Sequence, residues 1–413
     1  MRVTFVAPNY LPSRGGAQEH VRQLAEGLAA RDHQVSVLTT NHLRSPAARE
    51  PVATAVGLEV VGGVEVRRFA TPRSVALVLR LARIAAASIR RRRPGAAAKP
   101  MGPWLSGPWS PGLIRGVRAA LRSDDVVVGA VAPYTSVVLP TWLRPSSRAR
   151  IAAMPLLHLT AADPPAAVLR ALRRSDAVLA STEFEAAADR SFGVPADRVS
   201  VIPPGVAGAT ATDLDPREAR RHVGLPERPT VGFIGRLAEY KGILTLLEAA
   251  SELWRTHPDV TILVAGNFIG WDAYRTVLDE QVTQGRLVIR EGFAEDERSW
   301  LMSACDVVVH PSREESFGLI ALEAWAAHRP VVLGDIPAVR SFIRPGETAE
   351  LVGPSDAPAL AATLAELLDD PDRRRRLAVA GHAEIEERFD WERVCDAWEA
   401  VLRRLVVSEG AVS

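Results

Sequence analysis

Two glutamates, Glu315 and Glu323, flank a short segment where a strand pattern gives way to a helical one. Residues 306–310 have the apolar pattern of a buried strand, and the alanine-rich stretch after Gly318 is typical of a helix. Backbone N–H groups at the start of a helix lack partners within it and can hold a phosphate. The pattern therefore predicts that two carboxylates and a phosphate-binding turn share one ligand.

The spacing of these carboxylates favours binding over paired acid–base catalysis. On one continuous helix, Glu315 and Glu323 would lie about 12 Å apart along the axis. That separation is too wide for the carboxylate pair of a glycosidase. We expect the two side chains to bind two ends of one ligand. A purely structural role for Glu323, as a buried or N-terminal helix carboxylate, is the alternative.

A second loop, residues 235–242, carries two cations between a strand pattern and a helical pattern. Arg236 and Lys241 could converge on a diphosphate, whose negative charge grows as it leaves. Two surface charges without a ligand would have the same spacing. Lys99 and Lys241 are the only lysines in the chain, against 50 Lys plus Arg. A lysine kept in a tight loop of an arginine-rich chain favours the functional interpretation.

Three further features are weaker signals. Gly15 and Gly16 would let backbone approach a phosphate or a sugar, but a glycine pair before a helix is often only a turn. His158 follows an apolar strand pattern, where a lone histidine is more often structural. The D-x-D triplet that ends at Asp215 precedes Pro216 and predicts a helix N-cap. Because C-x-x-C, H-x-H and H-E-x-x-H motifs are absent, we expect no metal ion.

Composition narrows the class of protein. A chain of 413 residues is too long for one ordinary core, so two or three domains are expected. A formal net charge of +1 argues against a nucleic-acid binder. Two distant cysteines, Cys305 and Cys395, do not suggest a disulfide framework. The N-terminal pattern is not that of a signal peptide, and no apolar run reaches the roughly 18 residues of a membrane span. These features predict a cytoplasmic location.

Strand, loop and helix patterns alternate along the chain and then start again. A strand at 3–7, a glycine loop and a helix at 17–30 begin a parallel βαβ unit. The pattern restarts with a strand at 230–234. We predict an α/β protein with two doubly wound halves joined near residues 205–228. Ligands of such sheets bind at the carboxyl ends of the strands, so a cleft between the halves is the expected site.

Residues 75–93 predict a basic amphipathic helix, because Arg80, Arg83, Arg90 and Arg91 fall within about 100° of one another on a helical wheel. A solvated surface helix explains this pattern most simply. Contact with an anionic membrane surface or an anionic acceptor is the alternative. In that case the protein would lie peripherally at the inner face of the membrane.

These blocks together resemble the retaining glycosyltransferases of family 4. The resemblance extends over nearly the whole chain and is most specific in two segments, GFIGRLAEYKGILTLLEA and PSREESFGLIALEAWAAHRPVV. It implies the GT-B fold, in which two Rossmann-like domains face each other across a cleft. Residues 1–205 would bind the acceptor and residues 206–389 the donor. A C-terminal helix, at about 390–413, would cross back to the N-terminal domain.

The resemblance also implies the reaction. A sugar would pass from a UDP- or GDP-linked donor to an acceptor hydroxyl, with retention and without a metal or other cofactor. The product would be a glycan, a glycolipid or a secondary metabolite. A non-catalytic nucleotide-sugar-binding or partner subunit on the same fold is the alternative. The base, the sugar, the linkage and the oligomeric state are left open.

Individual residues acquire roles from the same resemblance. Arg236 and Lys241 would bind the diphosphate, and Glu315 would contact the donor sugar. Glu323 would bind the ribose hydroxyls, and His158 would lie at the reacting face. The catalytic set would be His158, Glu315, Arg236 and Lys241. The donor-binding set would be Gly15, Gly16, Gly235, Arg236, Lys241, Phe293, Glu315, Ser316, Phe317, Gly318, Leu319 and Glu323.

The acceptor site is the least defined. Residues 99–112 form an irregular segment in which Trp104 and Trp109 stand among prolines and glycines. We expect these two side chains, with Arg14 and Tyr134, to contact the acceptor.

Overall fold

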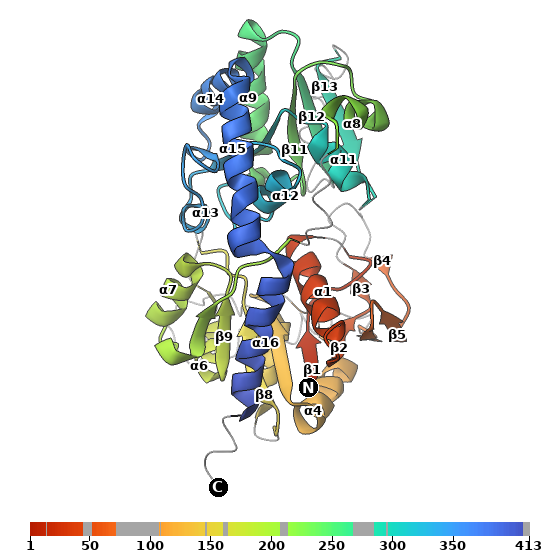
Figure 1. The fold of residues 1–413 in the computed structure, drawn as a ribbon. Coiled ribbons are helices and arrows are strands. Elements are labelled where there is room, and N and C mark those ends of the chain that lie inside the picture. Colours follow the sequence, from red (N-terminus) through yellow and green to blue (C-terminus); the bar gives the residue numbers. More distant parts are fainter. Residues whose placement is uncertain are drawn as a thin grey trace, which may run out of the picture. The chain divides into compact units, whose positions relative to one another are not determined.

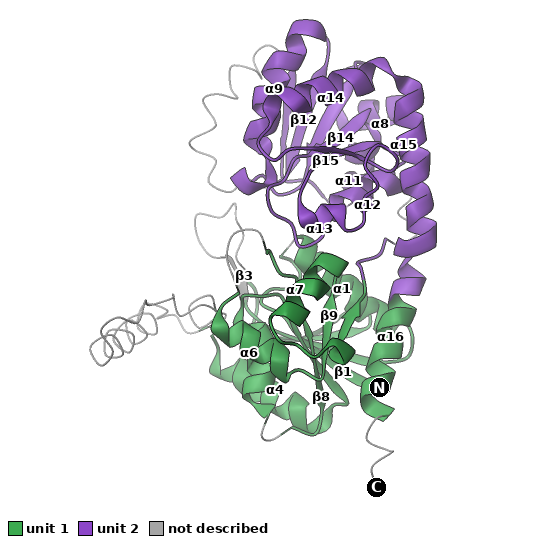
Figure 2. Cartoon of the chain, turned by 90° about the vertical axis from the view of Figure 1, so that its left-hand side faces the viewer, with its two compact units in different colours: residues 1–202, 395–413 green, residues 203–394 purple. Residues whose placement is uncertain are grey.

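The computed structural model describes most of the chain as two compact units (Figure 2). Unit 1 is formed by residues 1–202 together with the chain from Cys395 onward, and unit 2 by residues 203–394. Both are doubly wound α/β units, as the sequence predicted. The described residues are 1–13, 15–43, 52–71, 107, 109–144, 147–159, 164–206, 214–266, 285–294 and 296–407.

Unit 1 is built on an eight-stranded sheet with the order β10-β9-β8-β7-β1-β2-β6-β5. Its strands are β1 (Arg2–Val6), β2 (Gln34–Thr40), β5 (Gly57–Val61), β6 (Val64–Phe69), β7 (Val126–Ala130), β8 (Arg150–Met154), β9 (Ala177–Ala180) and β10 (Val199–Val201). A short antiparallel pair, β3 (His42–Leu43) and β4 (Val52–Ala53), stands apart from it. Strands β7 and β9 are apolar and buried along their whole length, because helices cover both faces of a parallel sheet.

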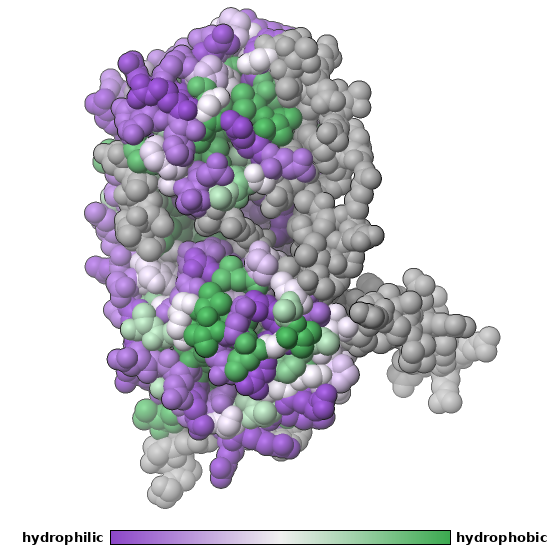
Figure 3. Space-filling model, turned by 90° about the vertical axis from the view of Figure 1, so that its right-hand side faces the viewer, coloured by the Kyte–Doolittle hydropathy of each residue, from purple (hydrophilic) through white to green (hydrophobic). Residues whose placement is uncertain are grey.

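Strand β5 is the edge of this sheet and pairs antiparallel with β6. Three apolar side chains on or beside it, Val56, Leu58 and Val60, are exposed. Figure 3 shows apolar patches among polar side chains on this side of unit 1.

Three described helices of unit 1 begin at a residue whose side chain or glycine backbone caps them. Ser110 accepts a hydrogen bond from Leu113 N, and Thr182 accepts one from Glu185 N. Gly15 caps the first helix through its carbonyl, which accepts from Glu19 N at 2.9 Å. The helices are α1 (Gly16–Ala29), α4 (Pro111–Ser123), α5 (Thr135–Trp142), α6 (Ala166–Arg174) and α7 (Glu183–Ser191), with a 3-10 turn at Ala196–Arg198.

The C-terminal helix α16 (Trp391–Val407) packs on unit 1 (Figure 1). The ring of Trp398 lies 6.2 Å from that of Phe5 on β1. Glu399 contacts His33 at 3.1 Å, and Arg150 Nε donates to the carbonyl of Leu405 at 3.1 Å. The predicted return of this helix to the N-terminal part of the chain is therefore confirmed.

Unit 2 has a parallel six-stranded sheet with the order β13-β12-β11-β14-β15-β16. Its strands are β11 (Thr230–Ile234), β12 (Thr261–Gly266), β13 (Leu287–Glu291), β14 (Val307–His310), β15 (Val331–Gly334) and β16 (Glu350–Val352). Side chains alternate between the two faces of each strand. Val231 and Phe233 join the core on one face of the sheet, and Ile234 joins the core on the other.

Seven described helices cover this sheet. They are α8 (Pro216–Val223), α9 (Ile243–Thr256), α11 (Glu297–Ser303), α12 (Ile320–Ala326), α13 (Pro337–Arg340), α14 (Ala357–Asp369) and α15 (Pro371–Glu384). Helix α15 continues through a π-helical turn, Ile385–Phe389, toward α16.

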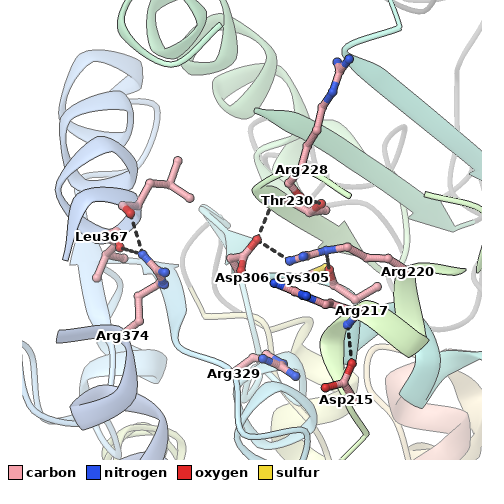
Figure 4. Close-up of polar contacts among 12 residues, drawn as sticks. Asp215, Arg217, Arg220, Arg228, Thr230, Cys305, Asp306, Arg329, Leu367 and Arg374 are labelled. Carbon is pink, nitrogen blue, oxygen red and sulfur yellow. Dashed lines mark hydrogen bonds and ion pairs between the residues drawn. The ribbon is translucent and has the colours of Figure 1, made fainter. Parts of the chain in front are cut away.

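An ion pair joins α8 to the amino ends of the central strands in unit 2 (Figure 4). Arg220 Nη2 donates to Asp306 Oδ2 at 2.6 Å, and the same oxygen accepts from Thr230 N at 2.7 Å. At the start of α8, Asp215 accepts from the backbone N–H groups of Arg217 and Glu218. The end of the D-x-D triplet is thus a helix N-cap, as predicted; Asp213 lies outside the described residues.

Several predictions fall on parts of the chain that the structure does not describe. They are the basic helix at 75–93 and the candidate acceptor residues Arg14 and Trp104. Among the helices that are described, none is long and apolar enough to cross a membrane.

Candidate functional site

Glycines allow the carboxyl ends of the strands in unit 2 to come unusually close. A Cβ on Gly266, at the end of β12, would overlap the carbonyl oxygen of Gly235 after β11. Gly242 has φ +83°, and a Cβ there would overlap the carbonyl oxygen of Pro311 after β14. Because only glycine tolerates both this backbone conformation and this approach, the 235–242 loop lies against the segment that follows β14.

Lys241 and Glu315 form a buried ion pair where these two loops meet. Lys241 Nζ donates to Oε1 and to Oε2 of Glu315, at 2.6 Å each. The side chains are 15% and 8% exposed, so water screens the pair little. The sequence analysis assigned these residues to different parts of a ligand, whereas the structure joins them directly.

His310 and Ser312 extend this pair into a network. Ser312 Oγ donates to Glu315 Oε1 at 2.8 Å, and the same hydroxyl lies 2.8 Å from His310 Nδ1. A hydroxyl has one proton to donate, so Nδ1 of His310 must carry the hydrogen that Ser312 accepts. The imidazole also stacks on Phe233, with ring centroids 4.5 Å apart. The sequence pattern alone did not indicate a role for Ser312.

The charges in this network follow from burial and from the cation. Burial alone would raise the pKa of Glu315, but Lys241 and then His310 outweigh it and hold that pKa well below its usual range. Burial lowers the pKa of His310. At neutral pH the network therefore contains an ionised carboxylate beside a neutral imidazole.

Arg236 lies at the entrance of the same loop, directly after Gly235. Its side chain is half-buried and has no hydrogen-bond or ion-pair partner among the described residues. This differs from Lys241, whose charge Glu315 already balances. The loop therefore presents one guanidinium whose charge is open to an anion.

Glu323 belongs to a second cluster in unit 2. Arg298 on α11 donates to Glu323 Oε2 at 3.1 Å, and its guanidinium lies 5.1 Å from the ring centroid of Phe293. Both charged side chains are 27% exposed. Since α12 begins at Ile320, Glu315 lies in the preceding loop, and the two glutamates do not share one helix. The sequence analysis did not identify Arg298.

The segment between the two glutamates is anchored by its aromatic side chain. Phe317 is buried and stacks on Phe342, with ring centroids 4.3 Å apart. Gly318 follows with φ +108°, a conformation that favours glycine. The carbonyls of Gly318 and Leu319 accept from Ala321 N and Glu323 N, so these two residues lead from Phe317 into helix α12, which begins at Ile320.

In unit 1 the described candidate residues lie at one edge of the sheet, on loops or at the start of helix α1. Gly15 and Gly16 follow β1, Tyr134 follows β7, and His158 is exposed beyond the end of β8. Trp109 is close to the same edge, because the neighbouring Gly107 carbonyl accepts from Thr135 N at 3.1 Å. Parallel strands bring their carboxyl ends together, which explains why residues so far apart in sequence share this edge.

Among the described residues, no group of three or more His, Cys, Asp or Glu side chains is arranged to hold a metal ion. The described site chemistry consists of carboxylates, cations, a histidine and backbone groups.

Two family profiles match most of the chain. "Glycosyl transferase 4-like domain" matches residues 15–205, and "Glycosyl transferases group 1" matches residues 215–383. The chain is 33% identical over 274 residues to a D-inositol 3-phosphate glycosyltransferase of Stackebrandtia nassauensis, with 61% of each chain covered. It is 27% identical over 410 residues to a glycogen synthase of Mycobacterium tuberculosis, with 96% of this chain and 93% of that one covered. For several of the more identical relatives the match spans only about half of their length.

A similar fold occurs in the crystal structure of Anabaena HepE in complex with UDP-glucose. The TM-score is 0.72 at 19% sequence identity, with 98% of this chain and all of that one covered. At this identity the likeness concerns the fold alone. Together with the two family matches, it establishes that the chain belongs to the group 1 glycosyltransferases, with a glycosyltransferase 4-like N-terminal region and the GT-B fold.

Proposed function

We propose that this protein is a hexosyltransferase that moves a sugar from a UDP- or GDP-linked donor to an acceptor hydroxyl, with retention and without a metal ion. The observation that carries the proposal is the buried Lys241–Glu315 pair, together with Arg236, which lies on the same loop as Lys241 and has no hydrogen-bond or ion-pair partner among the described residues. The names of the relatives, a D-inositol 3-phosphate glycosyltransferase and a glycogen synthase, support the same class of reaction.

In this proposal the two cations bind the donor diphosphate. Arg236 offers planar, paired N–H donors for phosphate oxygens. Lys241 has three N–H donors and uses two on Glu315, so the third is available to an oxygen of the leaving group. As the bond to the sugar breaks, negative charge grows on the diphosphate, and fixed cations stabilise that charge without reorganising.

Glu315 would bind hydroxyl groups of the donor sugar. Its low pKa keeps it ionised, and an ionised carboxylate only accepts hydrogen bonds. Lys241 and Ser312 hold the carboxylate in one orientation. A sugar with hydroxyls at the matching positions would satisfy its remaining lone pairs.

Glu323 would bind the ribose hydroxyls of the nucleotide, with Arg298 keeping the carboxylate in place. Phe293 lies next to the same guanidinium, so the backbone around it is our candidate for contact with the base. In unit 1, His158 would lie at the reacting face of the sugar. Because Gly15 and Gly16 have no side chains, the ligand could approach their backbone closely. Trp109 and Tyr134 would contact the acceptor.

Calorimetric titration with UDP, GDP and ADP tests the donor side of this proposal. We expect one of the three to bind, and Arg236→Ala to weaken that binding by at least about tenfold, as for loss of a charge-assisted pair. The exposed Arg313, which pairs with Glu239, provides the matched control Arg313→Ala. Equal binding by both variants would remove Arg236 from the diphosphate site.

Three further assays separate the remaining alternatives. Hydrolysis of the bound donor without acceptor would exclude a non-catalytic binding subunit. The anomeric configuration of the product, read by NMR, tests retention. Turnover that survives exhaustive chelation tests the metal-independent mechanism.

A further inference from the structure

Helix α7 carries two buried carboxylates that the proposed chemistry does not use. Glu185 and Asp189 lie one helical turn apart and face the interior of unit 1. Burial is the largest influence on both groups and raises the pKa of Glu185 to about 7 and that of Asp189 to about 8. A buried carboxylate is costly to keep, so its contacts deserve an explanation.

Glu185 joins two loops at the carboxyl edge of the sheet. Its Oε1 accepts from Leu157 N at 2.7 Å, after β8, and its Oε2 accepts from Ser181 N at 2.8 Å, after β9. The residue also stands third after the N-cap Thr182, as in a capping box. A capping-box glutamate bonds the N–H of the N-cap itself. Here the carboxylate reaches one residue further out and across to the neighbouring loop.

The loop that Glu185 holds has an unfavourable backbone conformation. Leu156 has φ +51°, which costs a residue other than glycine about 1–2 kcal/mol. On one side, the carbonyl of Pro155 accepts from Ala132 N at 2.7 Å. On the other side, Leu157 is bonded through its N–H to Glu185. His158 is the next residue and is exposed. The strained turn at Leu156 therefore determines where the His158 side chain leaves the core. Glu185 is the side chain that stabilises this turn.

We propose that Glu185 is a positioning residue for His158. The proposal rests on the role assigned to His158 at the reacting face of the donor sugar. The carboxylate touches no ligand itself. It holds the N–H of Leu157, which keeps the turn at Leu156 in its strained form and directs His158 away from the core.

Asp189 provides the matched control within the same helix. Both of its carboxylate oxygens are buried, and neither has a hydrogen-bond partner in the described structure. Asp189→Asn removes a buried carboxylate from the same helix without changing a contact to the loop. Glu185→Gln makes the equivalent change but places an amide N–H against a backbone N–H, so one of the two bridging bonds is lost.

Hydrogen exchange on the full chain tests the geometry without relying on activity. Glu185→Ala removes both bridging bonds, and in this variant we expect the Leu157 amide to exchange at least about tenfold faster. In the matched Asp189→Ala variant we expect no change at Leu157. Unchanged exchange at Leu157 in Glu185→Ala would overturn the proposal.

Kinetics test the consequence for the reaction. A misplacement of about 1 Å can cost about 100-fold in rate, so we expect Glu185→Gln to lower kcat by about 10- to 100-fold. The KM for the donor and the affinity for the nucleotide should not change, which also shows that the variant is folded. The double variant with His158→Ala should be no slower than His158→Ala alone, because both changes act through one side chain.

Failure of the positioning role of Glu185 can be distinguished from failure of the proposed function. If the two kinetic effects multiply, or if KM rises while kcat stays constant, Glu185 does not act through His158. If the wild-type chain neither binds a nucleotide nor turns over a donor, the proposed function fails instead. The exchange result at Leu157 still decides whether Glu185 holds the turn.

Discussion

Each unit contains a buried glutamate next to the carboxyl ends of its strands, and the two glutamates have opposite electrostatic properties. Glu185 in unit 1 accepts from two neutral backbone N–H groups, and burial raises its pKa to about 7. Glu315 in unit 2 accepts from Lys241 and Ser312, and its pKa lies far below the usual range although it is equally buried.

The comparison shows that burial alone does not determine the charge of a carboxylate. Hydrogen bonds from neutral donors offset only part of the desolvation of Glu185, whereas an ammonium at 2.6 Å more than offsets that of Glu315. A glutamate with a cation stays ionised and suits ligand binding. A glutamate without one is near its titration point at neutral pH and suits a structural role.

Removing the cation Lys241 should have the largest effect on the difference between the two glutamates. In Lys241→Met, Glu315 is left buried without its partner, and we expect the free energy of unfolding to fall by about 3–5 kcal/mol. Turnover should fall by about 100- to 1,000-fold if Lys241 stabilises the leaving group. Urea unfolding and steady-state kinetics measure the two effects.

The control for this variant is Lys241→Met combined with Glu315→Gln. Without a buried charge, the double variant should regain much of the lost stability but none of the turnover. If Lys241→Met alone unfolds like the wild-type protein, the ion pair does not determine the state of Glu315.

The loop that delivers Lys241 depends on Gly242. In Gly242→Ala, the positive φ costs about 1–2 kcal/mol, and the added Cβ also forces the loop away from Pro311. We expect a total loss of about 2–3 kcal/mol in the free energy of unfolding. Gly346→Ala is the matched control, because Gly346 has a similar φ of +75° and open space around the new Cβ. Equal losses in both variants would show that the approach to Pro311 is unimportant.

The buried carboxylates of unit 1 predict a pH dependence of the opposite sign to that of Glu315. The folded-state pKa of Asp189 is about 8, above its ordinary value of 3.8, so the folded protein retains a proton that the unfolded chain releases. Stability should therefore fall as pH rises from about 4 to about 8. Asp189→Asn removes this loss. Because each unit of pKa shift is worth about 1.4 kcal/mol, we expect the free energy of unfolding of the variant to exceed that of the wild type by at least about 2 kcal/mol at pH 8.

Glu315→Gln serves as the comparison for that measurement. Because the folded-state pKa of Glu315 is depressed, its contribution to stability is present above its ordinary pKa and is lost as pH falls below it. Denaturant unfolding at pH 4, 6 and 8 separates the two variants. Parallel pH profiles for wild type and Asp189→Asn would contradict the assignment for Asp189.

The smallest effect is expected at Arg298. Its pair with Glu323 is 27% exposed on both sides, so Arg298→Met should change the free energy of unfolding by less than about 1 kcal/mol. If Glu323 binds the ribose, loss of the positioning guanidinium should weaken nucleotide affinity several-fold. Calorimetric titration measures this, with Arg313→Met as the control for losing an exposed ion pair. An unchanged affinity would leave Arg298 without a part in donor binding.

Much of the fold could be predicted from local patterns. The apolar runs at β11 and β14 predicted buried parallel strands, because such runs fit sheets covered on both faces. Asp215 was predicted to cap a helix, because a carboxylate before a proline suits that position. The alternation of strands and helices was enough to divide the chain into two doubly wound halves.

What the sequence by itself determined is therefore the set of elements and the chemical types present at their ends. Which of those groups meet was decided only by the tertiary structure. Lys241 and Glu315 are 74 residues apart, and Leu157 and Glu185 are 28 apart, so no local pattern couples them. In each unit, the parallel sheet places the carboxyl ends of its strands at one edge. In unit 2, close backbone approaches at Gly242 and Gly266 then bring the loops that carry Lys241 and Glu315 together. Since a carboxylate's charge depends on its burial and on the donors within about 3 Å, only the folded arrangement distinguishes the ionised Glu315 from Glu185, which is near its titration point at neutral pH.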